Sequence, residues 1–113
     1  MSRLDSIFGS LSDPTRRDIL RRVSRRGMSV GKIASHYELS LAGVAKHLDV
    51  LARAGLVRKT RNGKEHIVTI APDALAEANG YLEKYRQLWE HRLDTLDRYL
   101  QSINKRREGY GAD

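Results

Sequence analysis

Residues 29–55, SVGKIASHYELSLAGVAKHLDVLARAG, decide the fold of this chain. The stretch holds two apolar patterns with the spacing of amphipathic helices, and a short polar break separates them. Ser29 and Ser40 each stand immediately before one of the patterns, where a serine side chain can accept a hydrogen bond from a free backbone N–H of the first turn. The stretch therefore predicts a helix-turn-helix unit, with helices over 30–37 and 41–54.

Individual residues of this unit indicate how its two helices pack. Val44, Leu48 and Leu51 share one face of the second helix and are expected to be buried. Leu39 is expected to fill the corner between the helices. Glu38 stands where many such units have a glycine, so we expect a turn that is longer or differently shaped.

Two further helices are predicted before residue 29. The second of them is expected over 14–26, because Asp13 can cap it and Pro14 suits its first position. Gly27 is expected to end it. The first carries apolar residues at helical spacing, which are Leu4, Ile7, Phe8 and Leu11.

A basic hairpin is predicted directly after residue 55. Residues 56–71 contain two strand-like runs on either side of Asn62-Gly63, a pair that favours a tight turn between antiparallel strands. Helices followed by such a hairpin form a winged helix-turn-helix. The expected element order is α-α-α-α-β-β-α, which is a mainly α fold with a β-hairpin wing.

A long helix is predicted over 72–105, followed by a frayed tail over 106–113. Asn79-Gly80 can break or bend this helix. The helix has more apolar surface than the core of so small a domain needs, so we expect it to pair with a second copy of the chain, together with Leu4, Ile7 and Phe8. The apolar stripe consists of Leu82, Tyr85, Trp89, Leu93, Leu96, Leu100 and Ile103.

Composition limits the class of protein. The 113 residues suffice for one domain and contain no cysteine, which excludes disulfides and thiolate metal sites. No apolar run is long enough for a membrane span or a signal peptide, so we expect a cytoplasmic protein with no membrane partner. Residues 1–71 carry 14 Lys and Arg against 6 Asp and Glu, a net +8, whereas residues 72–113 carry 7 against 8, a net −1. This asymmetry indicates that the first part binds phosphates.

Three segments resemble the ArsR-type family of small bacterial winged-helix repressors, namely SLSDPTRRDIL (10–20), LAGVAKHLDVLARAGLV (41–57) and RNGKEHIVTI (61–70). The C-terminal helix YLEKYRQLWEHRLDTLDRYL (81–100) resembles a subgroup of that family that lacks metal sites. The resemblance covers nearly the whole chain. It implies a homodimeric, sequence-specific regulator of transcription that binds double-stranded DNA and represses from a pseudo-palindromic operator.

Candidate DNA contacts come from the second helix of the helix-turn-helix and from the wing. Similar proteins carry Gln, Pro and Ser or Thr where this chain has Leu41, Ala42 and Ala45, so we expect sparse base reading and more weight on phosphates and DNA shape. The helix offers Ser40, Leu41, Ala42, Gly43, Ala45, Lys46 and His47, of which Lys46 and His47 are the polar readers. The wing offers Arg58, Lys59, Arg61, Asn62 and Lys64.

Arg16 and Arg17 stand in the first turn of the helix over 14–26. A cation at that end opposes the helix dipole, which favours a role for at least one of the two. We expect a contact with a DNA phosphate or with an acidic partner across the dimer. Exposure to solvent without a role is the alternative.

No catalytic or metal site is predicted. Glu90, His91, Asp94 and Asp97 cluster in the C-terminal helix, but the matching half of the family's carboxylate–histidine site would stand near Ala78 and Gly80 and is absent. We therefore expect no metal, no other cofactor and no enzyme activity. Two alternatives stay open: a metal- or ligand-responsive sensor on the same scaffold, and a protein-interaction module that uses the basic face.

Overall fold

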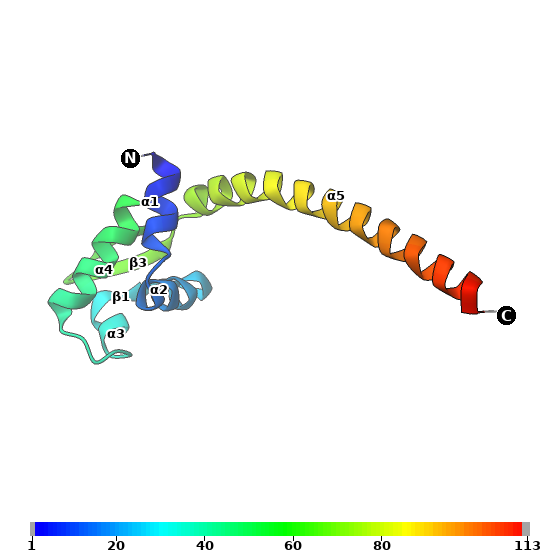
Figure 1. The fold of residues 1–113 in the computed structure, drawn as a ribbon. Coiled ribbons are helices and arrows are strands. Elements are labelled where there is room, and N and C mark those ends of the chain that lie inside the picture. Colours follow the sequence, from blue (N-terminus) through cyan, green and yellow to red (C-terminus); the bar gives the residue numbers. More distant parts are fainter. Residues whose placement is uncertain (1, 112–113) are drawn as a thin grey trace. The chain divides into compact units, whose positions relative to one another are not determined.

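The computed structural model describes the backbone of residues 2–111 and the side chains of residues 2–106 (Figure 1). Contacts divide the chain after Asn79, so the residues before this point form a winged-helix unit and those after it form a C-terminal helical segment. The predicted winged helix-turn-helix is confirmed. Its elements are α1 (Arg3–Ser10), α2 (Pro14–Arg25), β1 (Met28–Ser29), α3 (Val30–Ala34), α4 (Leu41–Arg53), β2 (Val57–Asn62), β3 (Glu65–Ile70) and α5 (Pro72–Gly111).

Short polar side chains cap the first four helices. Asp13, Ser29 and Ser40 each accept a hydrogen bond from the backbone N–H three residues later, as the sequence predicts. Ser2 does the same for α1 and forms a reciprocal capping box with Asp5. These caps fix where each helix begins, including α4.

The core of the winged-helix unit lies between the inward faces of α1 to α4 and the sheet. Val44, Leu48 and Leu51 are fully buried, which confirms the predicted inward face of α4. Ile7 also has no exposed surface, so its predicted place in a contact between subunits is wrong. Other large side chains that are fully or almost fully buried include Ile19, Val23, Ile33, Leu56 and Val68.

A short strand that the sequence did not predict extends the hairpin to a three-stranded antiparallel sheet, in the order β1-β3-β2. The strand is only two residues long, and Met28 pairs with Val68. Gly27 precedes it, and a Cβ atom there would lie 2.9 Å from Cγ2 of Thr69. Gly27 therefore allows β1 to approach β3. Helix α2 ends at Arg25, just before the glycine expected to end it, but Gly27 itself has no positive φ.

The turn between α3 and α4 is longer than the usual one. Helix α3 ends at Ala34 and not at Tyr37, and hydrogen bonds from His36 N to Ile33 O and from Tyr37 N to Ala34 O tighten the chain beyond it. No described residue other than glycine has a positive φ, so the turn accommodates Glu38 without strain. Leu39 is 41% exposed and does not fill the corner, which corrects the prediction.

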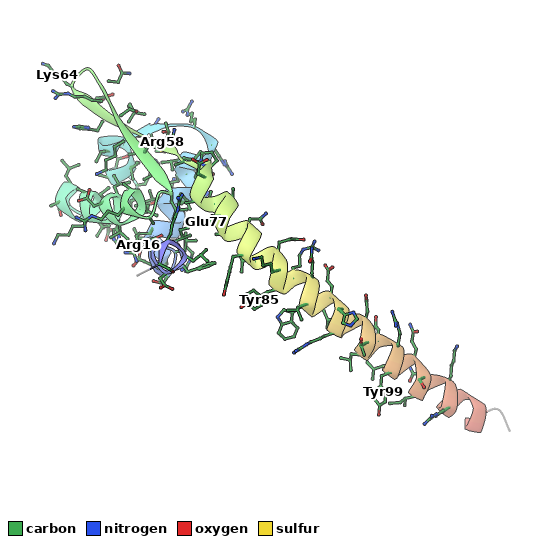
Figure 2. The ribbon with its side chains drawn as sticks, turned by 90° about the horizontal axis from the view of Figure 1, so that it is seen from above. Arg16, Arg58, Lys64, Glu77, Tyr85 and Tyr99 are labelled. Carbon is green, nitrogen blue, oxygen red and sulfur yellow. The ribbon has the colours of Figure 1, made fainter. Side chains whose placement is uncertain are left out.

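The wing turns one residue later than the sequence predicts. Asn62 still pairs with Glu65, so the loop consists of Gly63 and Lys64. Gly63 has φ +66°, and a glycine with positive φ at the first of two loop positions is the pattern of a type II′ turn. Lys64 consequently lies at the tip of the wing (Figure 2).

Helix α5 contributes to both parts of the chain. Ala74 and Ala78 are buried in the winged-helix unit, and Arg3 pairs with Glu77 at 2.7 Å. The helix is not interrupted at Asn79-Gly80, although a glycine inside a helix costs about 1 kcal/mol. It also continues to Gly111, whereas the sequence suggested an end at residue 105 and a frayed tail. Lys105, Arg106, Arg107 and Glu108 are good helix formers, which explains the extension; residues 112 and 113 lie outside the described residues.

Candidate nucleic-acid interface

The outward face of α4 is exposed and mostly small or apolar. Leu41 is 63% exposed, and Ala42 and Lys46 are also exposed, whereas Gly43 and Ala45 are half-buried. Small side chains let the helix axis approach another surface closely. Within the described residues Lys46 has no ion-pair partner, so its ammonium group is the free cation of this face.

A hollow of about 390 Å³ joins this face to the wing. Leu41 and Ala45 of α4 line one side, and Lys64 and His66 of the wing line the other. The structure therefore brings together residues that the sequence assigned to DNA contact from two separate elements. Sequence reasoning did not assign four other residues that line this hollow, which are Ser29, Val30 and Gly31 at the start of α3 and Glu65 of the wing.

His47 is directed into the protein and not toward the open face of α4. Its side chain is 23% exposed, with Nδ1 3.9 Å from Oδ2 of Asp13 and 3.4 Å from Nη1 of Arg16. The expectation that the His47 ring is free to reach a base is therefore not met, because reading a base would require these contacts to break.

The cations of the wing differ in how far the chain itself neutralises them. Lys59 Nζ lies 2.9 Å from Oδ1 of Asp49 on α4, and this hydrogen bond lowers the pKa of the Asp49 carboxyl. Arg58 Nη2 lies 3.9 Å from Oδ2 of Asp73 at the start of α5. Arg61 donates to the carbonyl oxygen of Gly63, which is uncharged. Arg61 and Lys64 consequently keep their full charge near the tip.

Arg16 and Arg17 stabilise the end of the helix that precedes them. Arg16 Nε donates to the Ser10 carbonyl at 2.6 Å and Nη2 to the Gly9 carbonyl at 3.3 Å, while Arg17 Nη1 donates to the Leu11 carbonyl at 2.8 Å. Helix α1 has no basic residue in its own last turn. The two guanidinium groups therefore donate to carbonyls at its negative end, which accounts for their position at the start of α2 without a DNA contact.

A polar cluster that the sequence did not reveal ties α2 to the turn after α3. Tyr37 Oη donates to Oδ2 of Asp18 at 2.5 Å, and Arg21 and Arg22 donate to the same carboxylate. These bonds, led by that from Tyr37, hold the pKa of Asp18 well below its usual value. Burial and the nearby Asp18 charge raise the pKa of Tyr37. The cluster fixes α3 on α2, and so it positions the helix-turn-helix.

The C-terminal segment exposes nearly all of its described side chains. The predicted stripe is 47% to 60% exposed from Leu82 to Leu100, and Tyr85 and Tyr99 project from the helix in Figure 2. Arg86 pairs with Glu83 and Glu90 on the same helix. Within residues 2–106 no group of three or more His, Asp or Glu side chains converges as metal ligands would. In the same part of the chain no helix has the length and apolar character needed to cross a membrane.

Comparison with known proteins places this geometry in a family. A helix-turn-helix domain family matches residues 11–60, which run from the end of α1 into the wing. The chain is 34% identical over 61 residues to the transcriptional repressor SdpR of Bacillus subtilis, covering 54% of this chain and 68% of SdpR. It superposes on the ArsR family transcriptional regulator RHA00566 with a TM-score of 0.74 and 30% identity, covering 79% of this chain and 98% of that one. The chain belongs to the ArsR family.

An ArsR-like transcriptional regulator from Rhodococcus sp. RHA1 also has a similar structure. It superposes with a TM-score of 0.69 and 32% identity, covering 83% of this chain and 89% of that one. This ArsR-family protein is accordingly a DNA-binding transcriptional regulator with a winged helix-turn-helix. The relatives are named as transcriptional regulators. The family assignment also agrees with the resemblance found in the sequence.

Proposed function

We propose that this ArsR-family protein is a homodimeric repressor that binds a pseudo-palindromic operator through α4 and the wing of each subunit. The observation that carries the proposal is the hollow between α4 and the wing. Its lining combines the apolar side chains of Leu41 and Ala45 on α4 with Lys64 of the wing, which makes no ion pair among the described residues. A duplex offers the complementary features, which are a major groove that admits a helix and a phosphate backbone beside it.

Within this proposal, base reading depends mainly on Lys46. The other exposed side chains of α4 near its start are Leu41 and Ala42, which carry no hydrogen-bonding group. Leu41 can contact a thymine methyl group, and Lys46 can donate to guanine acceptors. Arg61, Asn62 and Lys64 contact the backbone, and Arg58 and Lys59 add less because Asp73 and Asp49 partly neutralise them.

The dimer is proposed from the apolar stripe of α5. Six of its side chains stay about half exposed in one subunit, from Leu82 to Leu100, which is unusual for large apolar residues of a monomer. Leu88 and Tyr99 are exposed as well and widen the surface. Leu4 and Phe8 of α1 are partly buried against the core and remain candidates for the same contact. A two-fold dimer would place the two α4 helices about 34–36 Å apart, one turn of DNA.

The experiment is a binding titration with DNA from around the protein's own gene, followed by footprinting. We expect a protected site with two related half-sites and an affinity that falls with salt, and we expect scrambled DNA to bind more weakly. Sedimentation of the same sample measures the assembly. Equal binding to scrambled DNA would refute sequence-specific repression, and a monomer at tens of micromolar would refute the dimer.

A further inference from the structure

A second basic surface lies outside the hollow between α4 and the wing. It is formed by the C-terminal half of α2, by α3 and by the residues directly after each helix. These enclose a hollow of about 280 Å³ with one apolar residue, Met28 of β1, in its lining. The polar lining consists of Arg21, Arg22, Arg25, Arg26, Lys32 and His36. We refer to these six residues as the α2–α3 basic surface.

The charge of this surface is largely uncompensated. Asp18 is the carboxylate that contacts it, and its bonds go to Arg21 and Arg22. Among the described residues Arg25, Arg26 and Lys32 make no ion pair. Elsewhere in the chain cations such as Arg3, Lys59 and Arg86 lie against carboxylates. One carboxylate therefore faces five permanent positive charges here.

Helix stability alone does not account for this arrangement. The negative end of α2 favours one or two cations in its last turn. However, Arg21 and Arg25 place like charges four residues apart on α2, which repel each other, and Arg22 and Arg26 line the same hollow. Lys32 adds a further cation from a different helix, so the repulsion is not confined to α2. Such a surface is expected where a polyanion supplies the missing negative charge.

The surface adjoins the proposed DNA-binding hollow along the chain. Met28 and Lys32 line the α2–α3 basic surface, whereas their neighbours Ser29 and Gly31 line the hollow between α4 and the wing. The segment from β1 into α3 thus separates the two hollows, and a backbone that passes along one of them can continue over the other. The chemistry of the lining also favours phosphate, because planar guanidinium groups bind it in a bidentate manner. A protein partner would need apolar anchors, and the lining offers only Met28.

We propose that the α2–α3 basic surface binds backbone phosphates of DNA that flanks the segment contacted by α4 and the wing. This inference rests on the proposed DNA-binding function and extends the protein's footprint beyond each half-site. Arg25 and Arg26 are the best probes because both are exposed and neither takes part in the Asp18 cluster that positions α3. Lys32 of α3 and His36 of the turn after it complete the surface.

The test compares two duplexes that share one specific site, one trimmed to the site and one extended by about ten base pairs on each side. Affinity is measured between 50 and 200 mM salt for the wild type and for Arg25→Ala/Arg26→Ala. Each lost phosphate contact lowers the log–log salt slope by about 0.9, so we expect a decrease of roughly 2 per bound subunit on the extended duplex. On the trimmed duplex Arg25→Ala/Arg26→Ala should have the same salt slope as the wild type.

Two further variants serve as controls. Lys84→Ala/Arg98→Ala removes the same two charges from exposed positions of the C-terminal segment and should leave the difference between the duplexes unchanged. Arg25→Lys/Arg26→Lys keeps the charge and should retain most of the slope. Circular dichroism establishes that each variant is folded.

The outcomes separate this inference from the proposed function. If the wild type binds neither duplex specifically, both fail. If the wild type binds but Arg25→Ala/Arg26→Ala keeps the wild-type slope on the extended duplex, the phosphate assignment is refuted while the proposed function stands. Equal losses on both duplexes would refute the flanking position. If Arg25→Ala/Arg26→Ala lost the wild type's binding to a poly-glutamate peptide while its DNA affinity stayed unchanged, the surface would instead be assigned to an acidic protein.

Discussion

Replacing Leu96 by glutamate should convert the dimer that we propose into a folded monomer. Leu96 is 51% exposed in one subunit and lies in the C-terminal segment, outside the core of the winged-helix unit. The unfolded and monomeric states therefore solvate the new carboxylate about equally well. In the dimer the carboxylate loses water, because the two-fold axis brings both copies of residue 96 into the contact.

The magnitude follows from the exposure of the side chain. Complete burial of a leucine contributes about 1.5–3 kcal/mol, so the exposed half contributes about 1 kcal/mol in each subunit and about 2 kcal/mol in the symmetric pair. A carboxylate buried without a partner adds several kcal/mol. A total on the order of 5 kcal/mol weakens the dimer by roughly 10³–10⁴.

Sedimentation velocity measures the assembly, and circular dichroism measures the fold of the same sample. Leu96→Glu should sediment as a monomer with a nearly unchanged spectrum and should bind the operator far more weakly. Arg98→Glu is the matched control, because it introduces the same carboxylate on the opposite side of α5 and should leave the dimer intact. A Leu96→Glu protein that remains dimeric would refute the assignment of the stripe to the subunit contact.

Three further predictions concern the winged-helix unit. Lys64→Ala should lower the log–log salt slope by roughly 1 on specific and random DNA alike, whereas Lys59→Ala should change it less, because Asp49 already pairs with Lys59; an unchanged slope for Lys64→Ala would remove the wing tip from the interface. Lys46→Ala should cost about 1–3 kcal/mol on the operator and less on random DNA, as competition titrations would measure, and equal losses would make Lys46 a backbone contact. Tyr37→Phe removes the bond to Asp18 and should cost about 1–2 kcal/mol of unfolding free energy at pH 7. Because the pKa of Asp18 is depressed below its ordinary 3.8, the stability that the carboxylate contributes is complete above that pH and is lost as the pH falls below it. The difference between Tyr37→Phe and the wild type in thermal unfolding should therefore shrink at pH 3, and a difference independent of pH would contradict the role of this bond.

The sequence predicted the features whose signals are local. The caps at Asp13, Ser29 and Ser40 and the inward face of α4 depend on residues within one or two turns, so spacing alone identifies them. Gly55 likewise ends α4 with φ +77°. The order of helices and wing follows from these local signals, and this order was enough to indicate the family.

The features that the sequence missed depend on partners distant along the chain. The contacts of Arg16 with Gly9 and Ser10 depend on how α1 folds back against α2, which no spacing rule reveals. The apolar spacing that includes Ile7 fits a helix face that contacts a second subunit as well as one that faces the core. Only the packing of α1 in the winged-helix unit shows that Ile7 is buried. Strand β1 has two residues and depends on β3 for its pairing, so it carries no periodicity of its own.

The guanidinium of Arg16 makes α1 and α4, the helix that we propose reads the DNA, mechanically dependent on each other. It holds the last carbonyls of α1 with two of its nitrogens and faces the His47 ring of α4 with the third. A displacement of the end of α1 must therefore either carry His47 with it or give up one of these contacts. An event at the N-terminal helix, such as the arrival or departure of a second subunit, thus has a direct route to the orientation of α4 that bypasses α3 entirely.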